Sequence, residues 1–368
     1  MRPRTVARMA MSAGQIDLFA DTAERAHIVE FVSTRFQGSK KRLTEWIWSK
    51  VSDLEFESVL DLFGGTGSVS HMFKGAGKRV VYNDILRFNW QIGRALLENN
   101  FVTLSNEEVN SVLTRSIAQT YPTFIADTFS GIYFTDEENA WLDQTVHNIE
   151  VNLGDPYKKC IARFALYQSC TIKRPYNLFH RSNLYMRTAN VMRSFGNATT
   201  WNKPFEVFFR KFVQEANLAV FDNGQRNQVL NVDALHVDEN CDLVYFDPPY
   251  VSDRGTGTDY FGFYQFLEGL AAYDDWPGRI DYKTKHLAIP GPPTPWTRPK
   301  EIAAAFDAVL RRYAEKILVI SYRDDGIPSI ETLSATLREL GKIVTIYRLP
   351  QKYVLSTRAT HEVLIVAR

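Results

Sequence analysis

The sequence predicts an α/β protein built on a mostly parallel sheet. Apolar runs at 58–63 and 79–82 flank a glycine-rich turn and a helical pattern, which is the order of a βαβ unit. Further strand patterns occur at 228–231, 243–246, 316–321, 342–349 and 361–367. The last two follow one another without a helix between them, so we expect an antiparallel edge at the C-terminus.

Composition sets limits on the class of protein. The chain of 368 residues can bury a full α/β core and still carry a second, smaller domain. Its net charge of +1 gives no overall attraction to nucleic acid, so any such attraction has to be local. The three cysteines lack metal-like spacing, and no apolar run is long enough to span a membrane. We expect a soluble cytoplasmic protein without a metal site.

The chain divides by pattern into a tail, a split α/β domain and an insert. Residues 1–27 are expected to be a flexible N-terminal tail. Segments 28–100 and 217–368 carry the strand–helix alternation, which is lost in the mainly helical pattern of 101–216. The proline-rich segment 290–299 is typical of a connector or surface loop.

The four residues Asp247-Pro248-Pro249-Tyr250 follow directly on the apolar run 243–246. Both prolines lack an N–H and fix φ, so the chain has to leave the sheet here. The Asp247 carboxylate and the Pro248 carbonyl could then accept hydrogen bonds from an exocyclic amino group while the Tyr250 ring stacks on a base. Two prolines are also an ordinary way to end a strand, and the tetrapeptide alone leaves that alternative open.

A glycine-rich turn, Gly64-Gly65-Thr66-Gly67, leaves the first buried strand. Glycines at such a turn let the backbone approach a ligand, and the turn lacks the Lys-Ser or Lys-Thr of a P-loop. Asp84 lies at the tip of the next strand, roughly 20 residues on, where an acid commonly binds ribose hydroxyls. The pattern predicts a nucleoside-bearing cofactor, although tight strand–helix turns need glycine for their own sake.

Positive charge is concentrated between Lys158 and Phe205, a segment without Asp or Glu. Aromatic and asparagine side chains are interleaved with its cations, as in surfaces that bind nucleic acid. The alternative is a helical segment whose cations are merely solvated. The contact candidates in this segment are Lys173, Arg174, Tyr176, Asn177, His180, Arg181, Asn183, Arg187 and Arg193.

Four motifs, in this order, resemble those of the Dam-like family of adenine-N6 DNA methyltransferases. They are Phe36-Gln37-Gly38-Ser39-Lys40, the stretch from Leu60 to Ser68, Asn83-Asp84 and Asp247-Pro248-Pro249-Tyr250. The resemblance implies a Rossmann-like methyltransferase fold with S-adenosylmethionine as cofactor. It also implies that the insert 101–216 is a DNA target-recognition region.

The resemblance further implies which residues bind the cofactor. Phe36 and Lys40 would contact it, Asp84 would hold the ribose, and Asp61 would face the methionine amino group. Asp247 would lie beside both the methyl donor and the target amine. The full expected set is Phe36, Lys40, Asp61, Phe63, Gly64, Gly65, Gly67, Asp84, Asp233 and Asp247.

Some of these assignments have open alternatives. Asp233 is included because family members place an acid near the cofactor adenine in this region, but an Asp here could equally cap a turn. Lys40 could be a solvated lysine of a first helical turn. The chain also departs from the family at Phe36, where tryptophan is frequent, and at Asp61-Leu62, where some members have Glu-Pro.

The implied reaction is site-specific methylation of adenine N6 in duplex DNA, with Asp247, Pro248 and Tyr250 as catalytic residues. The base would have to flip out, at a cost of a few kcal/mol. Stacking on Tyr250 would offset about 1–3 kcal/mol of this. The alternatives are methylation of adenine in RNA, methylation of a protein amide, which usually goes with Asn in place of Asp247, and a non-catalytic DNA-binding protein that keeps the fold.

The expected partners follow from this reading. They are double-stranded DNA and a cognate restriction endonuclease, with the protein associated with the nucleoid. The segment Gln15-Ile16-Asp17-Leu18-Phe19 also resembles the short peptide by which bacterial proteins dock on the replication sliding clamp. Five residues match such a peptide readily by chance.

Overall fold

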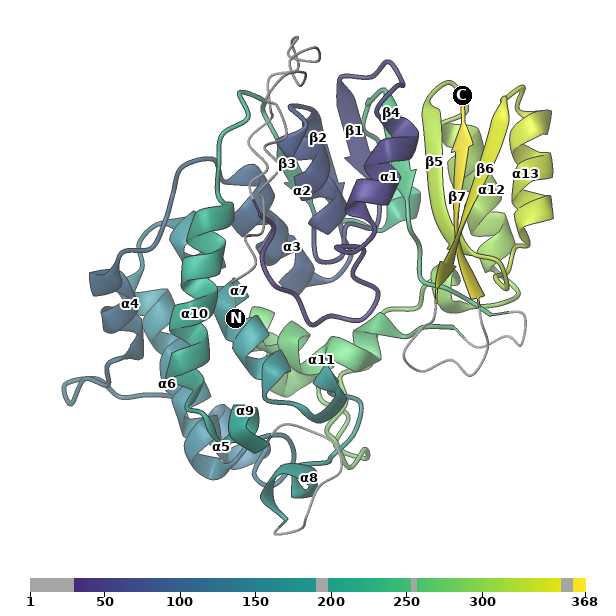
Figure 1. Cartoon of the computed structure of the whole chain (residues 1–368). Helices are drawn as coiled ribbons and strands as arrows, with labels where there is room; N and C mark the ends of the chain where they lie inside the picture. The colour runs from purple at the N-terminus through teal and green to yellow at the C-terminus, as the bar shows by residue number, and fades with distance from the viewer. Residues whose placement is uncertain (1–29, 190–197, 253–256, 352–359) are drawn as a thin grey trace, which may run out of the picture.

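A seven-stranded sheet forms the α/β core in a computed structural model that describes residues 30–189, 198–252, 257–351 and 360–368 (Figure 1). The strand order is β3-β2-β1-β4-β5-β7-β6, and β7 runs in the opposite direction to the other six strands. The strands are β1 (Ser58–Asp61), β2 (Arg79–Asn83), β3 (Gln228–Leu230), β4 (Leu243–Phe246), β5 (Ile317–Arg323), β6 (Val344–Gln351) and β7 (Thr360–Ala367). The predicted mostly parallel sheet with an antiparallel C-terminal edge is confirmed.

Helices cover both faces of the sheet. Helices α1 (Thr44–Val51) and α2 (Ser68–Gly75) pack on one face. Helices α12 (Ile302–Arg312) and α13 (Ile330–Glu339) pack on the other. With both faces covered, every residue of a central strand such as β4 is buried. This explains why these strands appear in the sequence as continuous apolar runs.

A helical part lies beneath the sheet in Figure 1 and has one continuous apolar core. Its helices are α3 (Arg87–Gly93), α4 (Asn106–Leu113), α5 (Phe124–Thr128), α6 (Asp136–Asn152), α7 (Pro156–Ile172), α8 (Tyr185–Thr188), α9 (Ala198–Asn202), α10 (Phe205–Ala219) and α11 (Tyr260–Ala271). Helices α3 and α11 lie outside the predicted insert 101–216 but share this core. The sequence-based division of the chain therefore stays a prediction.

Helix starts in this part follow local signals. Helices α4 and α6 begin at capping boxes, in which Ser105 pairs with Glu108 and Thr135 pairs with Glu138. Helix α7 is capped by Asp155, and Pro156 occupies its first turn. These caps determine the residues at which α4, α6 and α7 begin.

Two predicted segments, 290–299 and the N-terminal tail, differ in what the structure says of them. The segment 290–299 is more than a surface connector, because Trp296 is only 3% exposed and packs edge-on against Phe63. The predicted tail 1–27, with its Gln15–Phe19 peptide, and Arg193 lie outside the described residues. Within the described ranges, no helix combines the length and apolarity needed to cross a membrane.

Candidate active site

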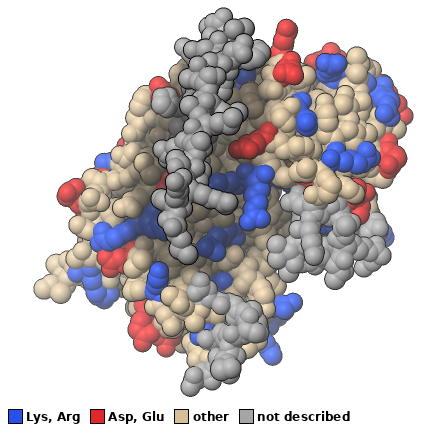
Figure 2. Space-filling view, in the orientation of Figure 1, with Lys and Arg blue, Asp and Glu red and all other residues tan. Residues whose placement is uncertain are grey.

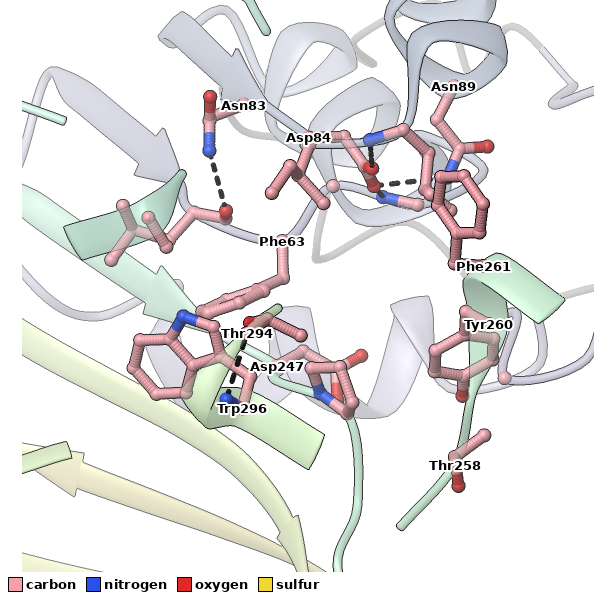
Figure 3. Close-up of a pocket in the computed structure, with 18 of the residues that line it drawn as sticks. Phe63, Asn83, Asp84, Asn89, Asp247, Thr258, Tyr260, Phe261, Thr294 and Trp296 are labelled. Carbon is pink, nitrogen blue, oxygen red and sulfur yellow. Dashed lines mark hydrogen bonds between the residues drawn. The ribbon is translucent and has the colours of Figure 1, made fainter. Parts of the chain in front are cut away.

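A cavity of about 390 Å³ opens at the carboxyl ends of β1, β2 and β4 (Figure 3). The carboxyl ends of parallel strands meet at one edge of a sheet, which is where ligands bind in open α/β folds. Nine of the ten predicted cofactor residues line it, namely Phe36, Lys40, Asp61, Phe63, Gly64, Gly65, Asp84, Asp233 and Asp247. Gly67 is not part of the lining, and its φ of +80° instead turns the chain into α2.

The glycine turn is shaped by close packing and by Asp84. A Cβ atom on Gly64 would lie 2.0 Å from the Tyr82 ring, so only glycine fits. The Asp84 carboxylate accepts hydrogen bonds from the Gly65 N–H at 2.8 Å and from the Asn89 side chain at 3.1 Å. Burial raises the pKa of Asp84 to about 6 although these bonds oppose the shift. Asp84 thus holds the turn and also faces the cavity.

Asp61 presents an incompletely bonded carboxylate to the cavity. One oxygen accepts a hydrogen bond from the Ser70 hydroxyl at 2.7 Å. The other, Oδ1, is buried and has no hydrogen-bond partner within the described part of the chain. Burial raises the pKa of Asp61 to about 7. A buried acceptor of this kind indicates a place for a donor from a ligand.

Asp233 combines the two alternatives that the sequence left open. Its carboxylate accepts a hydrogen bond from the Leu235 N–H at 2.9 Å and caps a short 3₁₀ turn. The residue also lines the cavity. Turn capping and a place beside the cavity are therefore compatible.

A buried ionic network lies behind the tetrapeptide. Lys40 Nζ is 3.0 Å from Asp247 Oδ1 and 3.2 Å from Glu362 Oε1, and it also contacts the Tyr250 hydroxyl. That hydroxyl lies 3.0 Å from each of the two carboxylates. The Ser321 hydroxyl donates to Glu362 at 2.7 Å. Lys40 is therefore a buried ion-pair partner, and the solvated alternative for it is wrong.

The charges of this network influence one another. Burial raises the pKa of Asp247 to about 6, Lys40 opposes this shift, and Glu362 adds to it. Burial disfavours the Lys40 ammonium, but Asp247 and Glu362 together raise the pKa of Lys40 above its usual value. Sequence analysis missed Glu362, although a carboxylate within the apolar run of β7 was a usable signal.

The aromatic lining differs from the one that the sequence indicated. Tyr250 is 8% exposed and packs edge-on against Tyr322, with ring centroids 5.3 Å apart. Neither it nor the buried Pro248 belongs to the cavity lining, so stacking of a base on Tyr250 stays a prediction. The aromatic residues that do line the cavity are Phe36, Phe63, Phe88, Tyr245, Tyr260, Phe261, Tyr264 and Trp296. Of these, sequence analysis had identified only the first two.

A model of the D12 class N6 adenine-specific DNA methyltransferase family matches residues 36–272. The chain belongs to this family. The match covers Lys40, the glycine turn, the helical part and Asp247, which the fold brings to one cavity. The protein is thus an adenine-specific DNA methyltransferase, as its motifs predicted, and the non-catalytic alternative is not supported.

Curated relatives resemble the methyltransferase along most of its length. It is 28% identical to the type II methyltransferase M2.HphI of Haemophilus parahaemolyticus, covering 88% of this chain and 93% of the relative. It is 24% identical to M.CviAII of Paramecium bursaria Chlorella virus 1, covering 84% and 90%. For M.NlaIII of Neisseria lactamica the identity is 22%, covering 83% and 88%.

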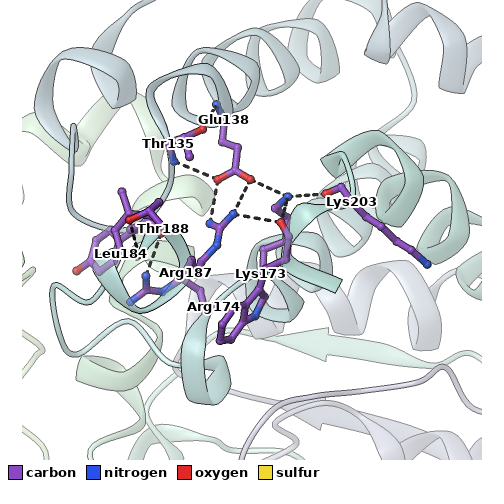
Figure 4. Close-up of polar contacts among 10 residues, drawn as sticks. Thr135, Glu138, Lys173, Arg174, Leu184, Arg187, Thr188 and Lys203 are labelled. Carbon is purple, nitrogen blue, oxygen red and sulfur yellow. Dashed lines mark hydrogen bonds and ion pairs between the residues drawn. The ribbon is translucent and has the colours of Figure 1, made fainter. Parts of the chain in front are cut away.

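Two of the predicted DNA contacts form an internal ion network (Figure 4). Lys173 is 2% exposed and donates to the carbonyl oxygens of Trp201 at 3.0 Å and Lys203 at 2.6 Å. Its ammonium also lies 2.6 Å from the Glu138 carboxylate, to which Arg187 donates two hydrogen bonds. In this conformation the charges of Lys173 and Arg187 are directed at Glu138 and not at a phosphate.

Arg174 and Asn183 are also inside the protein. The Arg174 guanidinium is 1% exposed and donates to the carbonyl oxygens of Tyr133, Leu178 and Arg181 at 3.0, 3.1 and 3.0 Å. It also bonds the side chain of Asn183, which is 6% exposed. Arg174 thereby fixes the loop 175–183 from below.

The other predicted contacts within the described residues are on this loop, at the surface. Tyr176 is 59% exposed, Arg181 is exposed, and Asn177 and His180 are half-buried. Tyr176 and Asn177 have φ values of +59° and +60°, which is rare for a tyrosine. On the face of the molecule drawn in Figure 2, Lys and Arg side chains gather near the centre, between the sheet and the helices.

Proposed function

We propose that the methyltransferase binds S-adenosylmethionine in the cavity at the sheet edge and methylates N6 of an adenine flipped out of duplex DNA. The observation that carries this proposal is Asp61 Oδ1, which is buried, has no hydrogen-bond partner among the described residues and suits the cofactor's methionine ammonium. Asp84 would accept from the ribose hydroxyls, and the aromatic lining suits an adenine ring. The cavity volume of about 390 Å³ is within the range of small-molecule sites.

When bound, S-adenosylmethionine would supply an electrophilic methyl group to the N6 lone pair, with the methyl–sulfur bond breaking as the C–N bond forms. The nitrogen, cationic after the transfer, would then release one proton to the Asp247 carboxylate. The Asp247 carboxylate would accept a hydrogen bond from one N6 hydrogen, and the Pro248 carbonyl would accept one from the other. These bonds would direct the N6 lone pair toward the methyl group. The negative charge of Asp247 would stabilise the cationic nitrogen in a site that excludes water.

DNA would be held by the surface side chains of the loop 175–183. Tyr176, Asn177, His180 and Arg181 are placed for this, and Arg193 stays in the proposed set. An exposed tyrosine in a left-handed conformation is a costly feature that functional sites often retain. We assign Lys173, Arg174, Asn183 and Arg187 the task of holding the loop in shape.

The proposal extends to partners. Relatives of similar length are type II methyltransferases, so we propose that a restriction endonuclease shares this enzyme's target sequence. Such pairing would place the enzyme with DNA in the cytoplasm, at the nucleoid. Docking on the sliding clamp through Gln15–Phe19 is proposed on sequence alone.

The test is methyl transfer from labelled S-adenosylmethionine to unmethylated duplex DNA, with RNA in parallel. Calorimetry measures binding of the cofactor alone. We expect cofactor binding and label only in N6-methyladenine of DNA. Label in RNA alone would contradict the assigned substrate. If DNA is labelled but Asp61→Asn binds S-adenosylmethionine as tightly as wild type, the assigned contact of Asp61 with the cofactor is wrong.

A further inference from the structure

Glu362 is a second buried carboxylate beside the catalytic motif. It lies near the start of β7, is 1% exposed, and stands opposite Arg323 of β5 in the sheet register. Because β7 is antiparallel, its first residues lie at the edge where β4 and β5 end. The antiparallel strand thus brings an acid from the end of the chain to within hydrogen-bonding distance of the Tyr250 hydroxyl.

Glu362 changes the charge balance around Asp247. If Lys40 faced Asp247 alone, the two charges would cancel. Lys40 instead lies between two carboxylates, at 3.0 Å from Asp247 and 3.2 Å from Glu362. When both acids are ionised, these three side chains together carry one net negative charge. Asp61, Tyr245 and Tyr260 also interact electrostatically with members of the cluster, and Arg323 interacts with Tyr260.

Hydrogen bonds hold Glu362 in this place. The Ser321 hydroxyl donates to its Oε1 at 2.7 Å, from the neighbouring strand β5. The Tyr250 hydroxyl reaches the same oxygen at 3.0 Å. Ser321 and Glu362 are almost fully buried, so the carboxylate has little freedom to move into solvent.

We propose that Glu362 is a positioning residue for methyl transfer, which shares Lys40 with Asp247 and so leaves the Asp247 carboxylate free to accept the N6 hydrogen. The inference rests on the proposed function of Asp247. A net negative cluster suits a nitrogen that becomes cationic and then loses a proton. The negative charge of Glu362 also opposes the ionisation of Asp247. Asp247 is therefore a stronger base than it would be if it were paired with Lys40 alone.

The test compares Glu362→Gln with Glu362→Asp in the full-length enzyme. The glutamine keeps the shape and can still accept from Ser321, but it removes the charge. We expect kcat to fall on the order of 10- to 100-fold. The KM values for cofactor and DNA should stay within about threefold, as for a group that acts only in the transition state. The acid limb of the kcat profile should move to lower pH, and Glu362→Asp should restore part of the rate.

A matched control is Asp324→Asn. Its carboxylate bonds His361, the neighbour of Glu362, at 2.7 Å but lies outside the cluster. It should leave kcat within about twofold of wild type. A wild-type kcat and acid limb in Glu362→Gln would overturn the proposal, as would equal losses in Gln and Asp variants with an unmoved limb.

Two further variants keep the test decisive. Ser321→Ala removes a hydrogen bond that fixes Glu362 while leaving the acid in the chain. A several-fold lower kcat at unchanged KM supports the proposal even if Glu362→Gln does not fold, and an unchanged kcat contradicts it. Activity retained in Asp247→Asn would instead overturn the proposed function of Asp247, so the two failures are distinguishable.

Discussion

The sheet edge and the cationic segment 158–205 differ in how distance along the chain relates to position in the fold. At the sheet edge, Lys40, Asp247 and Glu362 are far apart in the chain but meet within hydrogen-bonding distance. In the segment, Arg174 and Arg181 are only seven positions apart, yet one is buried and the other exposed. The sheet thus brings residues that are distant in the chain to one place, whereas in the helical segment residues of the same type and close in the chain differ in exposure.

Acids from other helices explain the difference. Glu138 of α6 forms ion pairs with Lys173 and Arg187. Glu150 of the same helix forms ion pairs with Lys159 and Arg163. A segment that lacks acids along the chain is therefore partly neutralised in space. A cationic stretch of sequence and a cationic surface are different things.

The largest expected effect concerns the buried ions of this segment. Glu138→Gln keeps a group that can cap α6 but removes the charge facing Lys173 and Arg187. Because both cations then lose the negative charge of Glu138, we expect a loss of about 3–5 kcal/mol in the free energy of unfolding, measured by urea denaturation.

The matched control is Glu206→Gln on α10, whose partner Arg210 is exposed. It should cost at most about 1 kcal/mol. Equal effects of the two substitutions would remove the contrast between buried and exposed cations.

The next effect concerns Asp61, whose pKa of about 7 lies above its ordinary value of 3.8. The Asp61 carboxyl has a higher pKa in the folded than in the unfolded protein, so its ionisation destabilises the fold. This loss of stability is absent below about pH 4, grows as pH rises, and is complete above about pH 7. Asp61→Asn should therefore stabilise the ligand-free protein by up to about 4 kcal/mol at pH 8. The gain should vanish near pH 4. A lower melting temperature of the variant at pH 8 would contradict this.

The pH profile of kcat tests the sheet edge directly. Burial raises the pKa of Asp247 to about 6, so its carboxylate becomes protonated at a higher pH than a free aspartate. As pH falls below about 6, kcat should therefore fall about tenfold per unit, measured at saturating substrates. A flat profile down to pH 5 would show that no such acid limits the reaction.

The smallest effect concerns the exposed loop. Arg181→Ala should weaken DNA binding several-fold and reduce the slope of log K against log salt by about 1, because one phosphate contact is lost. Its free energy of unfolding should stay within about 0.5 kcal/mol of wild type. Titrations at several salt concentrations measure this, and an unchanged slope would place the DNA elsewhere.

The sequence predicted much of the fold because its strands carry strong local signals. The β4 boundaries follow from an apolar run closed by Pro248 and Pro249, and the glycine turn marks the start of α2. The residues that line the cavity at the ends of β1 and β2 were predicted from the same motifs. Glu362 and Trp296 escaped because no local pattern connects them to Asp247, and only the antiparallel return of β7 and the packing of 290–299 bring them close.

In the proposed reaction, the Asp247 carboxylate holds the adenine amine for methylation. The most direct test is single-turnover methyl transfer by Asp247→Asn, with cofactor affinity and melting temperature measured on the same preparation. We expect the rate of N6-methyladenine formation to fall at least about 100-fold while the cofactor still binds and the fold persists. Methylation at more than about a tenth of the wild-type rate would contradict the claim.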